Sequence, residues 1–438
     1  MDMKNFRPVA ILSPLSKILE KIVYEQVYEY FTSNKIFHPN MHGFRQNRST
    51  QTALLSMYDR WVRAASEGQV TGVILLDLSA AFDLVEPKIL LEKLKIYGFE
   101  NDFITWIETY LTERYQAVWI DHTLSEFLKC DIGVPQGSNL GPLFFLLYFN
   151  DLLFTLDCKV ENYADDTTLS ATGQSVEEIS TKLTKDCTAV SDWMRCNMLK
   201  LNPDKTHILT VGTEERLRRL PQTVQVVMDN VVLKEDLTRC ELLLGCQVES
   251  NLKWHAQVAD LTTKLGKRLT GLENIKFILP FPIRKTVTEG IFNSILVYCL
   301  TLYGGSDRTH IRELQVLQNK AAQIVCHAPP RSNRAKLFEK LGWLSVNQLI
   351  MYHTLINVYR IRVCGEPEYL AQFLKNDSIT GRIIRTNTNL GLALRSFVFR
   401  GSSQWNSLPS SIRILTKIGT FKKKLRSWIL TNTPRFID

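Results

Sequence analysis

The stretch "NYADDTTLS", residues 162–170, places two adjacent aspartates, Asp165 and Asp166, inside a short apolar run. Two like charges side by side are costly to hold in a half-buried turn. The pair could sit in a solvated hairpin loop, where Asp is common. Alternatively, it could supply carboxylates to a Mg²⁺ site. The rest of the chain distinguishes these two interpretations.

Length and composition indicate a folded protein of several domains. The chain has 438 residues, of which 45% are hydrophobic and 22% charged, as in globular proteins. Its length predicts about two or three domains. No apolar run is long enough to suggest a membrane span, and the N-terminus lacks an apolar signal-peptide core. We therefore expect no membrane partner and a cytosolic or nuclear setting.

The nine cysteines are scattered singly, and none forms a CxxC pair. This spacing argues against both a disulfide framework and a zinc cluster. We expect reduced, mostly buried thiols.

Charge is distributed unevenly along the chain. Residues 1–250 carry 25 Lys and Arg against 34 Asp and Glu, a net charge of −9, whereas residues 251–438 carry 28 against 10, a net charge of +18. Such a basic half suggests a polyanionic partner, and nucleic acid is the favoured one. The alternative is a cationic surface that only confers solubility.

Local patterns predict the main elements. Ser13 followed by Pro14 is a helix start, and the run "VTGVILLDL" predicts a buried strand that ends at Asp77. Helices are expected over 13–31, 50–65, 102–111, 175–197, 257–275, 283–303, 308–327, 335–342 and 345–363. The predicted domains are residues 1–248, 249–330 and 331–438.

Three carboxylates together suggest a metal site. Asp77 ends a strand, and Asp165 and Asp166 follow 88 residues later at the expected tip of a hairpin. If the strands are neighbours in one sheet, the carboxylates converge at its edge and require a divalent cation to offset their repulsion. Two Mg²⁺ ions about 4 Å apart would activate a 3′-hydroxyl and stabilise a leaving pyrophosphate. This is polymerase chemistry.

Three other segments fit such a site. The segment "GVPQGSNLGP", residues 133–142, is a flexible loop that could approach a planar ligand, although it could equally be a plain strand-to-helix turn. Arg7, Arg45 and Arg48 offer guanidinium groups suited to phosphates. They could also be ordinary surface arginines.

The ordered motifs "LDLSAAFDLV", "GVPQGSNLGPLFFLLYFNDL" and "YADD" resemble those of a reverse transcriptase. The wider match is similar to non-LTR (LINE-type, jockey-like) retrotransposon polymerases. "NFRPVAILSPLSKILEK" and "HGFRQNRSTQTAL" resemble their first two finger motifs, and "LKLNPDKT" resembles their fourth palm motif. The resemblance covers nearly the whole chain.

The resemblance implies an α+β fold. It comprises a right-hand polymerase palm with partial fingers, followed by a mostly helical thumb and C-terminal domain. The implied activity is RNA-directed DNA synthesis by two-metal nucleotidyl transfer of dNTPs onto a primer 3′-OH. One alternative is a truncated or inactive nucleic-acid-binding fragment, and another is a polymerase of a different lineage, such as a group-II-intron maturase.

The family roles carry over where residues match. Asp77 and Asp165 correspond to the principal ligands of two Mg²⁺ ions, for which Mn²⁺ is an alternative, and Asp166 supports them. The backbone oxygen of Leu78 completes one metal shell. Lys205 corresponds to a general acid that protonates the departing pyrophosphate, although on its own it would read as a surface lysine.

Other matching residues concern the nucleotide. The ring of Phe82 corresponds to the gate that excludes a ribose 2′-OH, although without the motif a core phenylalanine would be the simpler reading. Gln136 and Gly137 would line the nascent base pair. Arg45 would contact template or nucleotide, as would Arg7.

The implied partners are an RNA template, a DNA primer, their hybrid and dNTPs. Lys264, Lys267 and Arg268 lie on one expected thumb helix and would contact the hybrid backbone. Trp343, Trp405 and Trp428 could stack on bases, but packing is the favoured reading. The endonuclease that family members usually carry upstream is not seen, so we expect it from a missing segment or in trans.

Overall fold

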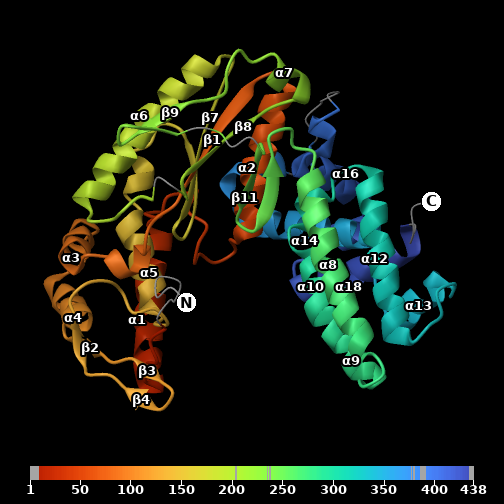
Figure 1. The fold of residues 1–438 in the computed structure, drawn as a ribbon, viewed down its shortest axis with the longest axis horizontal. Helices are drawn as coiled ribbons and strands as arrows, with labels where there is room; N and C mark the ends of the chain where they lie inside the picture. The colour runs from red at the N-terminus through yellow and green to blue at the C-terminus, as the bar shows by residue number, and fades with distance from the viewer. Residues whose placement is uncertain are drawn as a thin grey trace. The chain divides into compact units, whose positions relative to one another are not determined.

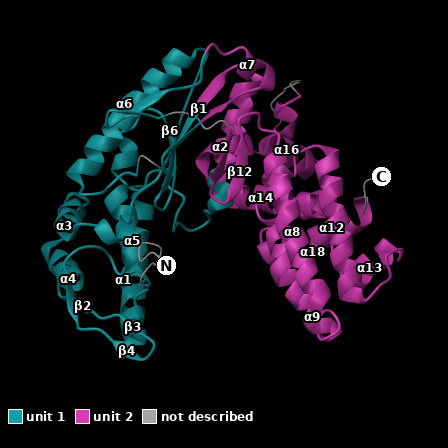
Figure 2. Ribbon diagram, in the orientation of Figure 1, with its two compact units in different colours: residues 1–53, 72–208, 222–235 teal, residues 54–71, 209–221, 236–438 magenta. Residues whose placement is uncertain are grey.

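The computed structural model describes residues 9–202, 205–233, 235, 238–375, 377, 380–384 and 391–433. The chain forms two compact units (Figure 2): unit 1 comprises residues 1–53, 72–208 and 222–235, and unit 2 comprises residues 54–71, 209–221 and 236–438. The predicted domain ranges 1–248, 249–330 and 331–438 stay predictions. The two compact units are each built from segments that are discontinuous in sequence, so they do not coincide with these ranges.

Unit 1 combines helices with short strands (Figure 1). Its helices are α1 (Pro14–Ser33), α3 (Pro87–Ile96), α4 (Asn101–Thr112), α5 (Leu140–Phe149) and α6 (Val176–Cys196). Its strands are β2 (Arg114–Gln116), β3 (Trp119–Ile120), β4 (Thr123–Leu124), β5 (Leu128–Cys130), β6 (Lys159–Tyr163), β7 (Asp166–Gly173), β9 (Val226–Met228) and β10 (Val231–Leu233). Residues of α2 (Thr50–Ser66), β1 (Val70–Leu76) and β8 (His207–Val211) fall in both units.

A four-stranded sheet in the order β6-β7-β1-β8 carries the predicted carboxylates. Burial of β1 is almost complete, as predicted from its apolar run. Helix α5 is buried on nearly every side, which identifies it as a core helix. The predicted strand before Asp77 and the predicted hairpin around Asp165 are both confirmed.

The first helix begins as its sequence predicts. The Ser13 side chain accepts a hydrogen bond from the Leu15 amide, and Pro14 occupies the first turn. Its apolar stripe, however, faces solvent: Leu15, Ile18, Leu19 and Ile22 are exposed, whereas Glu20 is buried. Helical periodicity located the helix correctly but does not identify its packed face here.

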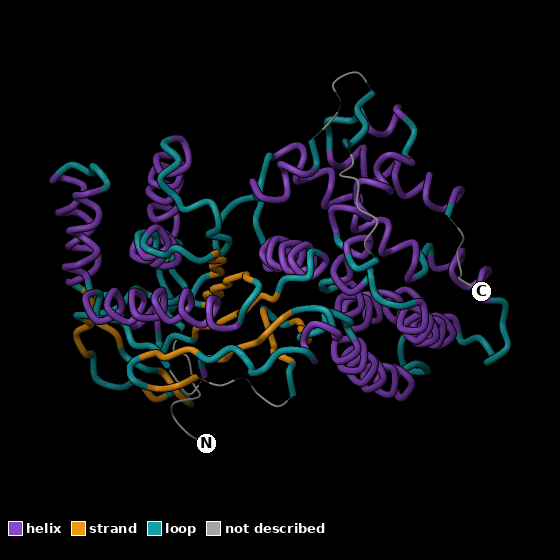
Figure 3. The backbone as a smooth tube through the Cα atoms, turned by 90° about the horizontal axis from the view of Figure 1, so that it is seen from above, coloured by secondary structure: helices purple, strands orange, loops and turns teal. Residues whose placement is uncertain are grey.

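Unit 2 is mostly helical, and helices make up more of the whole fold than strands (Figure 3). Its elements include α7 (Glu214–Arg218), β11 (Cys240–Leu243), β12 (Cys246–Glu249), α8 (His255–Ile275), α9 (Phe281–Thr288), α10 (Ser294–Val297), α11 (Leu300–Tyr303), α12 (Arg308–Cys326), α13 (Arg334–Leu341), α14 (Val346–Cys364), α15 (Glu368–Phe373), α16 (Phe397–Ser407), α17 (Ser410–Arg413) and α18 (Ile418–Asn432). The predicted α+β class with a mostly helical C-terminal part is confirmed.

One predicted helix is wrong. The expected helix over 283–303 is broken, because Tyr298 is extended and Cys299 adopts a left-handed conformation with φ of 53°. The prediction of mostly buried thiols is also wrong: Cys187, Cys246 and Cys299 are buried, four others are half-buried and two are exposed, although all nine are free. Trp343 and Trp405 pack in the core, as expected. Within the described ranges, no helix is both long and apolar enough to span a membrane.

Candidate active site

The β6–β7 hairpin presents Asp165 at its tip. The last paired residues are Tyr163 and Asp166, so Ala164 and Asp165 form a two-residue turn. Ala164 has a φ of 58°, the left-handed conformation that tight hairpin turns require. Asp165 is half-buried and Asp166 is exposed. The hairpin-loop interpretation of these aspartates is therefore correct, and it is compatible with a metal site.

Strand order brings Asp77 to the same edge of the sheet. A Cβ added to Gly72, early in β1, would meet the side chain of Ile179, and so would a Cβ added to Gly173, at the end of β7. Because the start of β1 lies beside the end of β7, the two neighbouring strands run antiparallel. The end of β1, after which Asp77 follows, and the start of β7, where Asp166 lies, are therefore at the same edge of the sheet.

These carboxylates share an edge without forming a closed cluster. In the described part of the chain, no three or more His, Cys, Asp or Glu side chains are grouped closely enough to hold a metal ion. Carboxylate oxygens suit Mg²⁺. The metal-ligand roles of Asp77, Asp165 and Asp166 stay predictions.

The backbone beside Asp77 is held by the segment that carries Lys205. The Asp77 carbonyl accepts from the Asn202 amide at 2.9 Å, and the Ser79 amide donates to Lys200 at 3.0 Å. Leu78 and Leu201 thus form an antiparallel bridge. The bonds on either side of Leu78 face this segment, so the Leu78 carbonyl itself points away from it. Its predicted metal contact stays a prediction.

Lys205 is held by the same segment. Its amide donates to the Asn202 carbonyl at 3.1 Å, and its side chain is exposed. The loop holding Lys205 is therefore tied to Asp77 through one residue, Asn202.

Phe82 is supported from behind by the core. It lies in a short 3₁₀ helix, Ala81–Leu84, and is half-buried. Its ring stacks on the buried ring of Phe145, with centroids 4.5 Å apart, and meets Phe44 edge-on at 6.1 Å. One face of Phe82 therefore packs in the core while the side chain keeps some exposure, and its gate role stays a prediction.

The loop after residue 133 packs directly on this turn. The Val134 amide donates to the Phe82 carbonyl at 3.0 Å, and the Gln136 side chain donates to Asp83 at 2.7 Å. Gly137 has a φ of 107°, and a Cβ there would lie 2.9 Å from the Ala10 carbonyl. Glycine is thus required at this position. The loop that bears Gln136 and Gly137 is therefore fixed against the turn that bears Phe82, and its nucleotide contacts stay a prediction.

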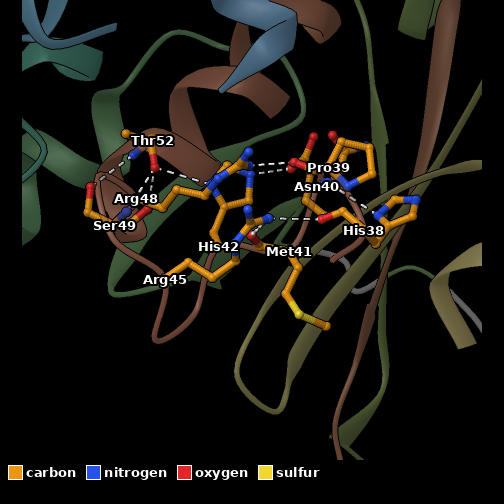
Figure 4. A network of polar contacts seen from close by, with 10 residues as sticks. His38, Pro39, Asn40, Met41, His42, Arg45, Arg48, Ser49 and Thr52 are labelled. Carbon is orange, nitrogen blue, oxygen red and sulfur yellow. Dashed lines mark hydrogen bonds and ion pairs between the residues drawn. The ribbon is translucent and has the colours of Figure 1, made fainter. Parts of the chain in front are cut away.

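The second finger motif lies against the hairpin (Figure 4). Met41 forms a parallel bridge with Asn162 on β6. A Cβ on Gly43 would sit 2.3 Å from the Ala164 amide nitrogen, so only glycine allows this approach. The loop therefore reaches the tip that bears Asp165.

Arg45 and Arg48 hold this loop together. The Arg45 guanidinium donates to the His38 and Met41 carbonyls at 3.1 and 3.4 Å and lies over the Phe37 ring. Arg48 donates to the Pro39 carbonyl (Figure 4). Burial, reinforced by these two positive charges, lowers the pKa of His38 to about 4. The predicted nucleotide contact of Arg45 stays a prediction, and here part of its guanidinium serves the loop.

The remaining predicted residues lie elsewhere. Arg7 falls outside the described residues. Lys264, Lys267 and Arg268 are exposed on α8 in unit 2, and Lys264 pairs with Asp260 at 2.7 Å. In unit 1, Asp77 and Asp166 lie at the ends of neighbouring strands with Asp165 in the adjoining turn, and the turn bearing Phe82 contacts the loop that bears Gln136 and Gly137.

A family model described as reverse transcriptase (RNA-dependent DNA polymerase) matches residues 1–253. The chain belongs to the reverse transcriptase family. This assignment confirms the predicted family and its palm-type fold, and members of the family use divalent metal ions.

Relatives place this reverse transcriptase near non-LTR retrotransposons. It is 25% identical over 362 residues to the probable RNA-directed DNA polymerase from transposon BS of Drosophila melanogaster, covering 80% of this chain and 39% of that protein. The corresponding enzyme from mobile element jockey of the same organism is 23% identical over 340 residues, covering 75% and 36%. The chain spans well under half the length of these curated relatives.

An apo telomerase from Candida tropicalis, truncated from its C-terminal domain, resembles this reverse transcriptase more distantly. It has a TM-score of 0.38 and 10% identity, over 54% of this chain and 44% of that one. The family assignment rests on the sequence match alone.

Sequence reasoning missed several residues that shape the site of this reverse transcriptase. Phe44 packs on Phe82, and the buried Glu20 carboxylate accepts the Asn139 amide at 2.7 Å. Below the hairpin, buried His42 contacts Glu161. An unusual glutamate between apolar positions was the available signal for Glu20. No local signal marks the other contacts.

Proposed function

We propose that this chain carries the RNA-directed DNA polymerase activity of a non-LTR retrotransposon protein. In that reaction a primer 3′-hydroxyl forms a bond to the α-phosphorus of a dNTP, and the bond to pyrophosphate breaks. The observations that support this best are the placement of Asp77 and Asp165 at one edge of the sheet and the contact between the Phe82 backbone and the 133–142 loop. Positioning and charge stabilisation dominate such transfers.

Two divalent ions, Mg²⁺ or alternatively Mn²⁺, fit the donor set. Asp77 and Asp165 would hold them, with Asp166 and the Leu78 carbonyl in support. When bound, such ions supply charge neutralisation and lower the pKa of a bound hydroxyl. The all-oxygen donors suit hard cations rather than zinc.

The remaining residues would bind and orient the nucleotide. Phe82, backed by Phe145, would meet a ribose 2′-OH with its exposed face and so favour dNTPs. Gln136 and Gly137 would line the nascent base pair, and Arg45 and Arg7 would contact phosphate or template. Lys205 would give its proton to pyrophosphate as a general acid.

Nucleic-acid partners follow from the same proposal. An RNA template, a DNA primer and their hybrid would contact the basic unit 2 side chains, including Lys264, Lys267 and Arg268 on α8. Such contacts give salt-dependent binding with little sequence preference. An endonuclease would come from another segment of a longer protein or in trans.

Primer extension on an RNA template tests the proposal. We expect dNTP incorporation by the full chain and its loss, by about 10³-fold or more, in Asp165→Asn and Asp77→Asn. The control is Asp157→Asn, because this exposed aspartate pairs with Lys185 at the opposite end of the β6–β7 hairpin. Equal incorporation by Asp165→Asn and the parent would disprove the assignment. Template binding without extension would instead support an inactive nucleic-acid-binding fragment.

A further inference from the structure

A buried histidine and glutamate connect the second finger motif to the catalytic hairpin. The Nε2 atom of His42 lies 2.7 Å from a carboxylate oxygen of Glu161, and the two side chains are 0% and 3% exposed. Glu161 lies on β6, four residues before Asp165. His42 comes directly before Gly43, whose missing side chain lets the loop approach Ala164. The His42–Glu161 pair therefore lies close to both the hairpin tip and the second finger loop.

The backbone reinforces this connection. The Asn162 amide donates to the Asn40 carbonyl at 3.0 Å, and the His42 amide donates to the Asn162 carbonyl at 2.7 Å. Residues 40–42 thus add to the outer edge of β6 as a short parallel partner. Met41, between them, is fully buried. The side-chain contact and the backbone hydrogen bonds therefore hold residues 40–42 and β6 in the same register.

Thr52 extends the network to the first turn of α2 (Figure 4). Its hydroxyl accepts from the Ser49 amide and donates to the Ser49 carbonyl, both at 2.9 Å. A hydroxyl has one proton, so the Nδ1 atom of His42, 3.1 Å away, must donate to Thr52. One further proton then lies between Nε2 and Glu161, whichever atom carries it.

A buried pair of this kind contributes little net stability. Desolvation of the two groups offsets most of their attraction, and apolar residues of the same volume often serve stability as well. What the pair supplies is a directional contact of fixed length. Its place below Asp165 and beside the loop bearing Phe44 makes that geometry relevant to the site, since Phe44 packs on Phe82.

We propose that His42 and Glu161 are positioning residues of the polymerase, which fix the Asp165–Asp166 hairpin against the second finger loop. Through Gly43 and Phe44, the same clamp sets the distance between the hairpin tip and the Phe82 gate. The kinetic part of this inference rests on the proposed function. The structural part, a rigid loop–hairpin connection, does not.

Four variants of the full chain test the proposal. Glu161→Gln retains a hydrogen bond to His42, whereas Glu161→Ala and His42→Ala each remove one partner of the His42–Glu161 contact and leave the other buried. The double variant His42→Ala/Glu161→Ala removes both groups and so avoids an uncompensated buried charge, which could unfold the single variants. Lys93→Ala is the control, because the Lys93 side chain on α3 is also largely buried and contacts the half-exposed Asp151 at 2.8 Å.

The kinetic readout separates positioning from folding. We expect Glu161→Gln to keep kcat within about threefold of the parent, and the double variant to lose about tenfold or more in kcat with KM for dNTP nearly unchanged. Lys93→Ala should lower the free energy of unfolding and leave kcat unchanged. A folded double variant with the parent's kcat would overturn the positioning role.

Hydrogen exchange tests the clamp without any catalytic assay. The amides of residues 162–167 should exchange about tenfold faster or more in the double variant than in the parent. In Glu161→Gln, these amides should stay as protected as in the parent. Unchanged exchange at these amides would overturn the clamp. If the parent itself does not extend primers, the proposed function fails, and this measurement still decides the structural inference.

Discussion

The Asn202 amide donates a 2.9 Å hydrogen bond to the carbonyl oxygen of Asp77. This contact joins the residue that follows β1 to the turn that leads to Lys205, whose amide bonds back to Asn202. The fourth palm motif is therefore held in register with the first predicted metal ligand. Asn202 links the predicted general acid to the predicted metal site.

Lys205→Ala is expected to lower kcat for dNTP incorporation by about 10²-fold, the usual contribution of general acid catalysis. KM should change little, because the lysine would act on the leaving group. The measurement is single-turnover primer extension. Lys159→Ala is the control, since Lys159 is also exposed but starts β6, at the opposite end of the strand from Asp165. Equal losses in both variants would assign Lys205 a general electrostatic role instead.

Phe82→Ala should admit rNTPs about 10- to 100-fold more readily, relative to dNTPs, because removal of the ring relieves a clash with the 2′-OH. The variant also loses the stack on Phe145, so its free energy of unfolding should fall by roughly 3 kcal/mol. Competition between dNTP and rNTP in primer extension measures the selectivity. Phe103→Ala controls for destabilisation, since Phe103 stacks on Phe99 with a similar geometry, 4.8 Å and 25°. Unchanged selectivity in Phe82→Ala would remove it from the gate.

Elements with a local signature were predictable from the sequence. A continuous apolar run identified the strand before Asp77, and short strand-like runs on either side of the aspartates identified the Asp165 hairpin. A capping serine followed by proline located the start of α1. The long helices α6, α8, α12 and α14 were also found to within a few residues. Each of these depends on interactions within a few residues of sequence.

Contacts between distant segments were not predictable in this way. His42 and Glu161 are 119 residues apart, and a pair of this kind leaves no periodic pattern. The exposed stripe of α1 shows the same limit, because periodicity identifies an amphipathic helix but not what covers it. Likewise, Arg45 looked like a phosphate ligand, whereas its guanidinium also bonds the loop carbonyls. Resemblance to family motifs located the predicted site, but the contacts between distant segments that support it could be identified only from the structure.

His38 should make stability depend on pH between about 4 and 6.5. Burial, reinforced by Arg45 and Arg48, lowers the pKa of His38 from 6.5 to about 4. The unfolded chain therefore takes up this proton at a higher pH than the folded one, and the free energy of unfolding falls as pH drops from 6.5 to 4. Because His38 is only half-buried and solvent screens part of the effect, we expect a loss of about 1 to 2 kcal/mol.

Urea unfolding at pH 7 and pH 4.5 measures how much His38 contributes to the pH dependence of the free energy of unfolding. In His38→Asn, the difference between the two pH values should be smaller than in the parent by that amount, since the other titrating groups are common to both proteins. The asparagine oxygen can still accept the Asn40 amide, which now bonds His38 Nδ1 at 3.2 Å. An identical pH dependence in the two proteins would contradict the assignment.

The three cations on α8 should contribute unequally to nucleic-acid binding. Removal of one phosphate-binding charge makes the slope of log K against log salt shallower by about 0.7 to 0.9. Lys267→Ala and Arg268→Ala should each show this change on an RNA–DNA hybrid. Lys264→Ala should show less, because its ammonium already pairs with Asp260 at 2.7 Å. Lys182→Ala is the control, since Lys182 makes the same kind of pair with Glu178 on α6. If all four variants keep the parent's slope, α8 does not contact the phosphate backbone.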